Sequence, residues 1–166
     1  MKKYLVAGLL VWLAAGTSLA ATFSLAGRAG LFTVPGGGAS SSMYGLAANV
    51  RLNDNWSLRA SIDTTSYTVG SSSVTYTPVM LDVIYSQTIG LVRPYVGAGV
   101  SYNTTTTTGL APVTSTGAQA EAGVNINLGG LYVGVEYCYL IPDLNHTNVN
   151  ASFANAYAVG GLMWGL

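Results

Sequence analysis

The side chains best suited to chemistry in this chain are few and far apart. The sequence holds one histidine, His146, and one cysteine, Cys138. Nucleophilic catalysis needs a hydroxyl or thiol beside a base, yet His146 is followed by Thr147 and Asn148 in a polar segment. Asp143 lies three residues earlier and makes a weak Asp-His couple. One cysteine and one distant histidine complete neither a four-ligand zinc site nor a disulfide. We predict no catalytic residue, no metal site and no cofactor.

Charged side chains are the second candidate for chemistry. After residue 20 the chain has no lysine, and four arginines against six carboxylates give four minus six, a net charge of −2. Asp54 and Asp143 fall in a turn and a loop, whereas the other eight lie in extended stretches. Those eight are Arg28, Arg51, Arg59, Asp63, Asp82, Arg93, Glu121 and Glu136. No basic patch is available to neutralise phosphates, so we expect no nucleic-acid partner.

The first twenty residues have the pattern of a processing signal. Lys2 and Lys3 precede an apolar run from Tyr4 to Ala15, and Ser18-Leu19-Ala20 has the small-x-small form of a cleavage site. The apolar run is shorter than the ~20 residues of a membrane-spanning helix. We predict a cleaved secretory signal peptide at 1–20 and one domain at 21–166; the alternative is an uncleaved anchor helix.

The composition after the signal points to a membrane rather than to water. Charged residues make up 7% of the chain, against ~25% in ordinary soluble domains. No later apolar run approaches the length of a spanning helix. Because only helices and closed barrels satisfy their backbone hydrogen bonds in lipid, we predict a transmembrane β-barrel.

The elements that position the charges are predicted to be eight antiparallel strands. The chain is rich in Val, Thr, Tyr and Gly, and clusters of Gly, Asn and Ser interrupt it. The predicted strands are 22–34, 43–52, 56–69, 74–87, 91–104, 116–128, 131–142 and 154–166. Short turns at 53–55, 88–90 and 129–130 alternate with connections at 35–42, 69–73, 105–115 and 143–153. This alternation is typical of up-and-down outer-membrane barrels, with turns and both termini in the periplasm.

Each predicted strand has one face without charge. Residues alternate between two faces along a strand, and the phase set by the apolar residues puts all eight strand charges on the opposite, polar face. A soluble β-sandwich also alternates, but it turns its apolar face inward. We expect the uncharged face in lipid and the charged face in a narrow lumen, where the charges pair because an unpaired buried charge is costly. Arg93 and Asp82 are expected to be close across a turn. Cys138 should be a buried, inert side chain on the lumen face.

Aromatic residues on the uncharged face fall near the strand ends. Such placement is typical of the aromatic girdles at the two membrane interfaces, although aromatics also favour strands in general. The predicted girdle consists of Phe23, Trp56, Tyr85 and Trp164 on the turn side and Tyr44, Tyr102 and Tyr139 on the loop side.

Two stretches resemble a known family. Arg93–Tyr102, with the sequence RPYVGAGVSY, is similar to a strand of small outer-membrane barrels of the OmpA, OmpW and opacity-protein type. The C-terminal GLMWGL resembles their assembly signal, with Gly161, Trp164 and Leu166 in the corresponding places. The family normally ends in Phe or Trp, so Leu166 is a departure from its pattern.

The resemblance implies a bacterial outer-membrane protein with a structural or surface-antigen role and a lumen plugged by salt-bridged polar residues. The alternative is a narrow OmpW-like channel for small apolar solutes or ions. A lipid-modifying enzyme is a distant third, because Asn148 stands where the barrel deacylases place a serine two residues from their histidine. The expected partners are outer-membrane lipid, the barrel-assembly machinery during insertion and any host or surface ligand that the loops contact. We expect a monomer.

Overall fold

The computed structural model describes residues 22–33, 40–145 and 153–165, and they form an all-β barrel. Its strands are β1 Thr22–Thr33, β2 Ser40–Arg51, β3 Trp56–Val69, β4 Ser72–Ser86, β5 Val92–Thr107, β6 Val113–Asn127, β7 Leu131–Ile141 and β8 Phe153–Gly165. The predicted eight-stranded antiparallel fold is confirmed. The predicted signal peptide and Leu166 lie outside the described residues.

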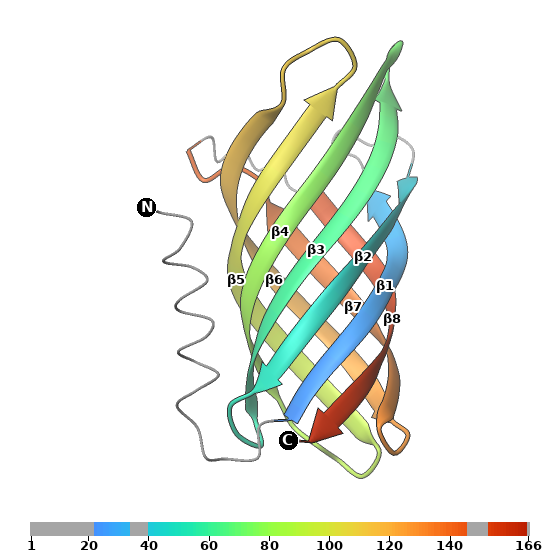
Figure 1. Ribbon diagram of the computed structural model, residues 1–166, viewed down its shortest axis with the longest axis vertical. Helices are drawn as coiled ribbons and strands as arrows, with labels where there is room; N and C mark the ends of the chain where they lie inside the picture. The colour runs from blue at the N-terminus through green and yellow to red at the C-terminus, as the bar shows by residue number, and fades with distance from the viewer. Residues whose placement is uncertain (1–21, 34–39, 146–152, 166) are drawn as a thin grey trace.

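The sheet closes on itself. Each strand pairs antiparallel with the next, and β1 pairs with β8, so that Phe23 lies opposite Trp164. Closure leaves no sheet edge, which is the condition for a sheet to stand in lipid. Figure 1 shows that β1 begins and β8 ends at the same end of the barrel, where the three short turns also lie.

The short turns follow from residues that favour tight backbone. Asn53 Oδ1 accepts the backbone N–H groups of Asn55 and Trp56, both at 2.9 Å, which fixes the β2–β3 turn. Gly129 and Gly130 join β6 to β7 with φ of 65° and 96°, a region that side-chain-bearing residues rarely adopt.

Three of the four connections at the opposite end are shorter than predicted. Ser40 to Ser42, Ser72 and Ser73, Thr105 to Thr107 and Val113 to Ser115 belong to strands rather than to loops. Threonine is a β-branched residue that fits a pleated surface, and facing hydroxyls bond across the strands, as Ser66 and Thr75 do at 3.0 Å. The prediction from polar composition that these segments are loops was therefore wrong.

The barrel wall is apolar outside and charged inside over most of its height. Outward side chains such as Val96, Val100 and Val135 are more than half exposed, at 56%, 54% and 59%. Inward charges such as Asp63 and Asp82 are each 1% exposed. None of the described residues belongs to a helix long and apolar enough to cross a membrane.

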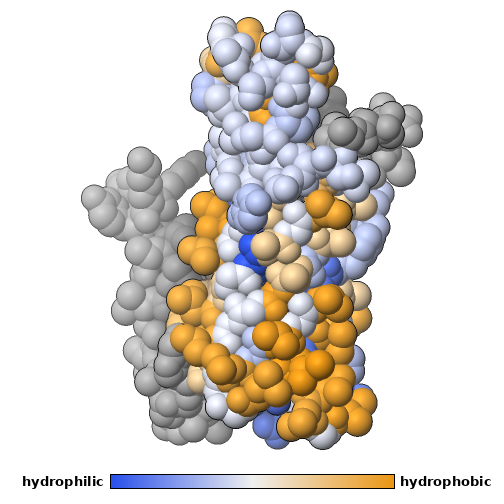
Figure 2. Space-filling model, turned by 90° about the vertical axis from the view of Figure 1, so that its right-hand side faces the viewer, coloured by the Kyte–Doolittle hydropathy of each residue, from blue (hydrophilic) through white to orange (hydrophobic). Residues whose placement is uncertain are grey.

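Strands β3 to β6 extend beyond the apolar zone. They have 14 to 16 residues, whereas a tilted strand crosses the hydrocarbon with about 9–11. On these extensions the outward face changes from apolar to hydroxyl-bearing side chains, and Figure 2 shows this change from orange to pale colours up one face of the barrel. The last apolar outward residues of β3, β4 and β5 are Ile62, Val79 and Tyr102, and the first hydroxyl residues beyond them are Thr64, Thr77 and Thr104.

Candidate functional site in the lumen

The middle of the lumen holds a network of buried ion pairs. Arg28 contacts Asp63 at 2.8 Å and Glu136 at 3.4 Å. Arg59 contacts Glu121 at 3.0 Å and also Glu136. Glu136 thus joins the two arginines into one cluster contributed by β1, β3, β6 and β7. All five side chains are at least nine-tenths buried, and ions taken out of water are stable only when they are paired.

Two tyrosines complete this network. Tyr157 donates a hydrogen bond to Asp63 at 2.9 Å, and Tyr95 donates one to Glu136 at 2.6 Å. Each ring also lies under a guanidinium, with Arg28 4.2 Å from the Tyr157 ring centre and Arg59 5.0 Å from that of Tyr95. A cation over an aromatic face gains further attraction where water is excluded. The network therefore joins buried side chains from β1, β3, β5, β6, β7 and β8 across the lumen.

Glycines make room for the inward carboxylates. Each of the four carboxylates lies directly opposite a glycine on a neighbouring strand. A Cβ added to Gly45 would lie 1.7 Å from Asp63 Oδ1, and one added to Gly99 would lie 2.3 Å from Asp82 Oδ1. Asp63, Asp82 and Glu121 thus lie over bare backbone, which lets them reach partners across a narrow lumen. The four pairs are Gly45–Asp63, Gly99–Asp82, Gly97–Glu121 and Gly123–Glu136.

Charge pairing is less complete than the sequence suggested. Asp82 accepts a hydrogen bond from Gln119 instead of pairing with Arg93. The strand register explains why, since Asp82 lies opposite Gly99, well above Arg93 on β5. Arg93 instead donates to Ser86 Oγ, at 2.9 Å from Nε and 2.7 Å from Nη2. The expected proximity of Arg93 and Asp82 was therefore wrong.

The loop side of the lumen contains a cluster of apolar side chains beside buried polar ones such as Asn103 and Asn155, which corrects the expectation of a polar interior throughout. Phe32, Met43 and Leu140 are fully buried there. Phe32 stacks on Tyr67 with ring centres 5.6 Å apart and lies 5.8 Å from Tyr76. Phe32 and Leu140 continue the inward phase of Arg28 and Glu136, so the alternation could have revealed them.

Cys138 lies between the apolar cluster and the ion-pair network. It is 1% exposed and belongs to the buried apolar cluster. Among the described residues no group of three His, Cys, Asp or Glu side chains is arranged to hold a metal. His146 and Asn148 lie outside the described residues.

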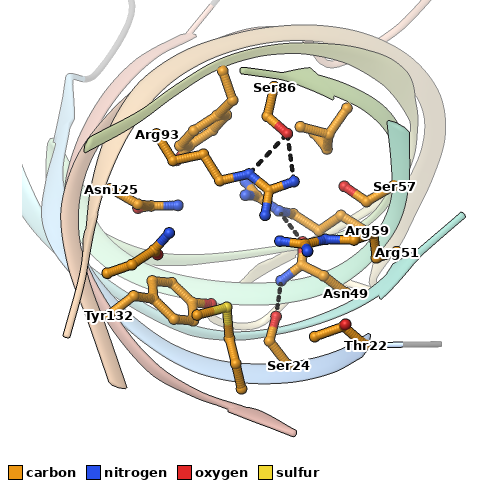
Figure 3. Close-up of a pocket in the computed structure, with 14 residues that line it drawn as sticks. Thr22, Ser24, Asn49, Arg51, Ser57, Arg59, Ser86, Arg93, Asn125 and Tyr132 are labelled. Carbon is orange, nitrogen blue, oxygen red and sulfur yellow. Dashed lines mark hydrogen bonds between the residues drawn. The ribbon is translucent and has the colours of Figure 1, made fainter. Parts of the chain in front are cut away.

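The turn side of the lumen is hollow. A pocket of about 60 Å³ opens at this end, and Arg51, Arg59 and Arg93 lie in its wall with several Asn and Ser side chains. In Figure 3 Arg93 and Arg51 reach inward from opposite parts of the wall. The lumen thus has three levels: a cationic pocket, an ion-pair network and an apolar cluster.

The aromatic residues predicted to form a girdle lie in two groups along the barrel. Trp56 and Tyr85 are 43% and 41% exposed and pack edge to face on the turn side. Tyr44, Tyr102 and Tyr139 are 60%, 55% and 38% exposed nearer the loop side. Phe23 is half-buried beside the turn end. Gly161 pairs with Ala26 in the wall, and the side chain of Trp164 lies outside the described ones.

This architecture defines the class of protein. A closed eight-stranded barrel with an apolar outer wall and a charged inner wall is a transmembrane β-barrel of the bacterial outer membrane. The chain belongs to the outer membrane protein β-barrel domain family, whose model matches residues 5–160. No curated protein is similar enough to this chain to count as a match.

Solved structures share the fold at low sequence identity. Neisserial surface protein A is 18% identical, with a TM-score of 0.70 over 86% of this chain and 96% of its own. The N-terminal β-barrel domain of Pseudomonas aeruginosa OprF is 16% identical, with a TM-score of 0.65 over 86% and 97%. The outer membrane enzyme PagL is 13% identical, with a TM-score of 0.51 over 84% and 98%. At these identities the likeness establishes the fold alone.

Proposed function

We propose that this protein is a non-enzymatic, non-conducting barrel with a structural or surface role in the outer membrane. The observation that carries this proposal is that side chains occupy the lumen in its middle and on its loop side. The network around Glu136 occupies the middle, and the cluster around Phe32 and Tyr76 occupies the loop side. An ion would have to displace both to cross, and bonded buried charges resist displacement.

The surface role rests on the extensions of β3 to β6. Their outward hydroxyl rows suit water and the polar outer layer of the membrane rather than hydrocarbon. We assign the turns and both chain ends to the periplasm and the extended hairpins to the outside, since barrels of this class have short periplasmic turns and longer outer loops. Neisserial surface protein A, which shares the fold, is by description a surface protein.

The outward aromatic residues are proposed to lie at the two membrane interfaces, where amphipathic rings are favoured. The C-terminal strand, with Gly161 and Trp164, is proposed to guide insertion by the assembly machinery. We also propose that the barrel acts as a monomer, because closure leaves no strand edge for a second copy to pair with.

Electrical recording in planar bilayers tests the closed lumen. The native protein is expected to show no stable conductance steps. A Phe32→Ala, Tyr76→Ala variant removes much of the loop-side cluster, and comparison with it shows whether that cluster contributes to closure. Stable steps from the native barrel, abolished by Arg93→Ala, would favour the narrow-channel alternative. A lipid A mass shift upon expression would instead favour a lipid-modifying enzyme.

A further inference from the structure

The wall of the pocket at the turn end holds arginines and, among the described residues, no acidic side chain. Arg59, at its inner end, is neutralised by Glu121 and Glu136. Arg51 and Arg93 have no carboxylate within ion-pair distance among the described residues.

Arg93 is held in place by neutral groups. Its Nε and Nη2 donate to Ser86 Oγ, and Nη2 also donates to the backbone carbonyl of Asp54 at 3.3 Å. The residue is 8% exposed, so its charge is largely removed from water. A buried guanidinium whose contacts are all neutral attracts an anion more strongly than a solvated one. The position of Arg93 is therefore fixed while its charge stays unmatched.

The inner carboxylates bond within the network and do not line the pocket. Glu136 accepts from Arg59 and Tyr95, Asp63 accepts from Arg28 and Tyr157, and Asp82 accepts from Gln119. Arg59 lines the pocket and binds the two glutamates, so its guanidinium stands between them and the cavity.

The cavity has the size and polarity for a small ion. Its volume is about 60 Å³, whereas one water needs roughly 10–15 Å³. Ser57, Asn49 and Asn125 add polar groups to the wall. The ion-pair network and the loop-side residues Phe32, Met43 and Leu140 lie beyond the cavity toward the loop end, so a ligand would enter from the turn end.

We propose that this pocket is a binding site for a small oxyanion of the phosphate type, bound by the guanidinium groups of Arg93 and Arg51. Guanidinium groups recognise phosphate oxygens with paired, charge-assisted hydrogen bonds. The source is either a free periplasmic anion or the phosphate of a lipid head group at the rim. Anion binding at this pocket does not depend on whether the barrel conducts ions, because the ligand needs only an open turn end.

Arginine Nε–Hε resonances test the site in the native barrel. The protein is held in maltoside micelles, which carry no phosphate, and inorganic phosphate is titrated at constant ionic strength against chloride. The resonances of Arg93 and Arg51 should shift and saturate, while that of Arg28, inside the network, should not. Adding phosphatidylglycerol without inorganic phosphate separates the sources, since a shift with lipid alone assigns the anion to a head group.

Three variants sharpen the test, each first checked for heat-modifiable migration as a folded barrel. Arg93→Gln and Arg51→Gln should each weaken phosphate binding about ten-fold or more, because each removes a charged donor. Asp54→Asn, at the exposed turn beside the mouth, should tighten it about two-fold. Equal shifts with chloride and phosphate, or no saturable shift with phosphate or lipid, would overturn the proposal.

Discussion

The middle of the barrel and its loop-side extension have opposite polarity, although the same strands build both. In the middle, Leu81 on β4 is 52% exposed while its neighbour Asp82 is 1% exposed. Further along β4, the outward residue is Thr75 and its buried neighbour is Tyr76. In the extension, as in a soluble protein, polar side chains face outward and apolar ones inward. In the middle, apolar side chains face outward and charged ones inward. The surroundings of each segment, not the strand itself, decide which face is apolar.

The change in polarity occurs at one level across neighbouring strands. Ile62 lies opposite Val79, and Val79 lies opposite Tyr102. One step further, Thr64 and Thr77 bring their hydroxyls within 3.3 Å. Because the register aligns the change on three strands, we infer that it marks the boundary between hydrocarbon and water.

The largest effect is expected from breaking the charged interior of the middle zone. Glu136→Ala removes contacts to Arg28, Arg59 and Tyr95, and should lower the free energy of unfolding by about 3–5 kcal/mol. Tyr76→Phe, in the interior of the extension, removes the hydrogen bond to Asn103 at 2.8 Å and should lower the free energy of unfolding by about 1 kcal/mol. Urea unfolding in lipid vesicles measures both. Equal losses in the free energy of unfolding would mean that the charged interior of the middle zone does not contribute more to stability than the interior of the extension.

The outer faces should differ by a smaller amount. Val96→Lys, at an outward position of the middle zone that is 56% exposed, should lower the free energy of unfolding by about 2–4 kcal/mol. Thr106→Lys, on the extension, should change stability by less than about 0.5 kcal/mol, as surface substitutions do. The same unfolding assay applies. A tolerant Val96→Lys variant would argue against lipid at this level.

The smallest expected effect on stability comes from replacing glycines on the inner and outer faces of the middle zone with alanine. Gly45→Ala places a methyl group 1.7 Å from Asp63 Oδ1 and should destabilise the barrel by about 1–3 kcal/mol. Gly27→Ala, on the outer face of β1, meets nothing within 4 Å and should be close to neutral. If both alanine variants unfolded alike, the glycines would not be needed to accommodate the acids.

Much of the fold could be predicted because alternation survives in every strand. The phase of Leu58 and Ile62 alone assigns Arg59 and Asp63 to the lumen. Partners could not be predicted, because a pair such as Asp82 and Gln119 depends on how three strands align. The extensions were not predicted for another reason: Thr105 to Thr107 have the composition of a loop, and only their surroundings make them part of a strand.

The hydrocarbon boundary on β4 tests the account most directly. Nitroxide labels are attached to single cysteines at the outward positions Ser73, Thr75, Thr77, Val79, Leu81 and Val83, in a Cys138→Ala background, with the protein in lipid vesicles. We predict that a water-soluble nickel chelate relaxes the labels up to Thr77, and that oxygen dissolved in lipid dominates from Val79 onward. Equal access of the chelate at Leu81 and Thr75 would contradict the claim that one strand passes from water into lipid at this level.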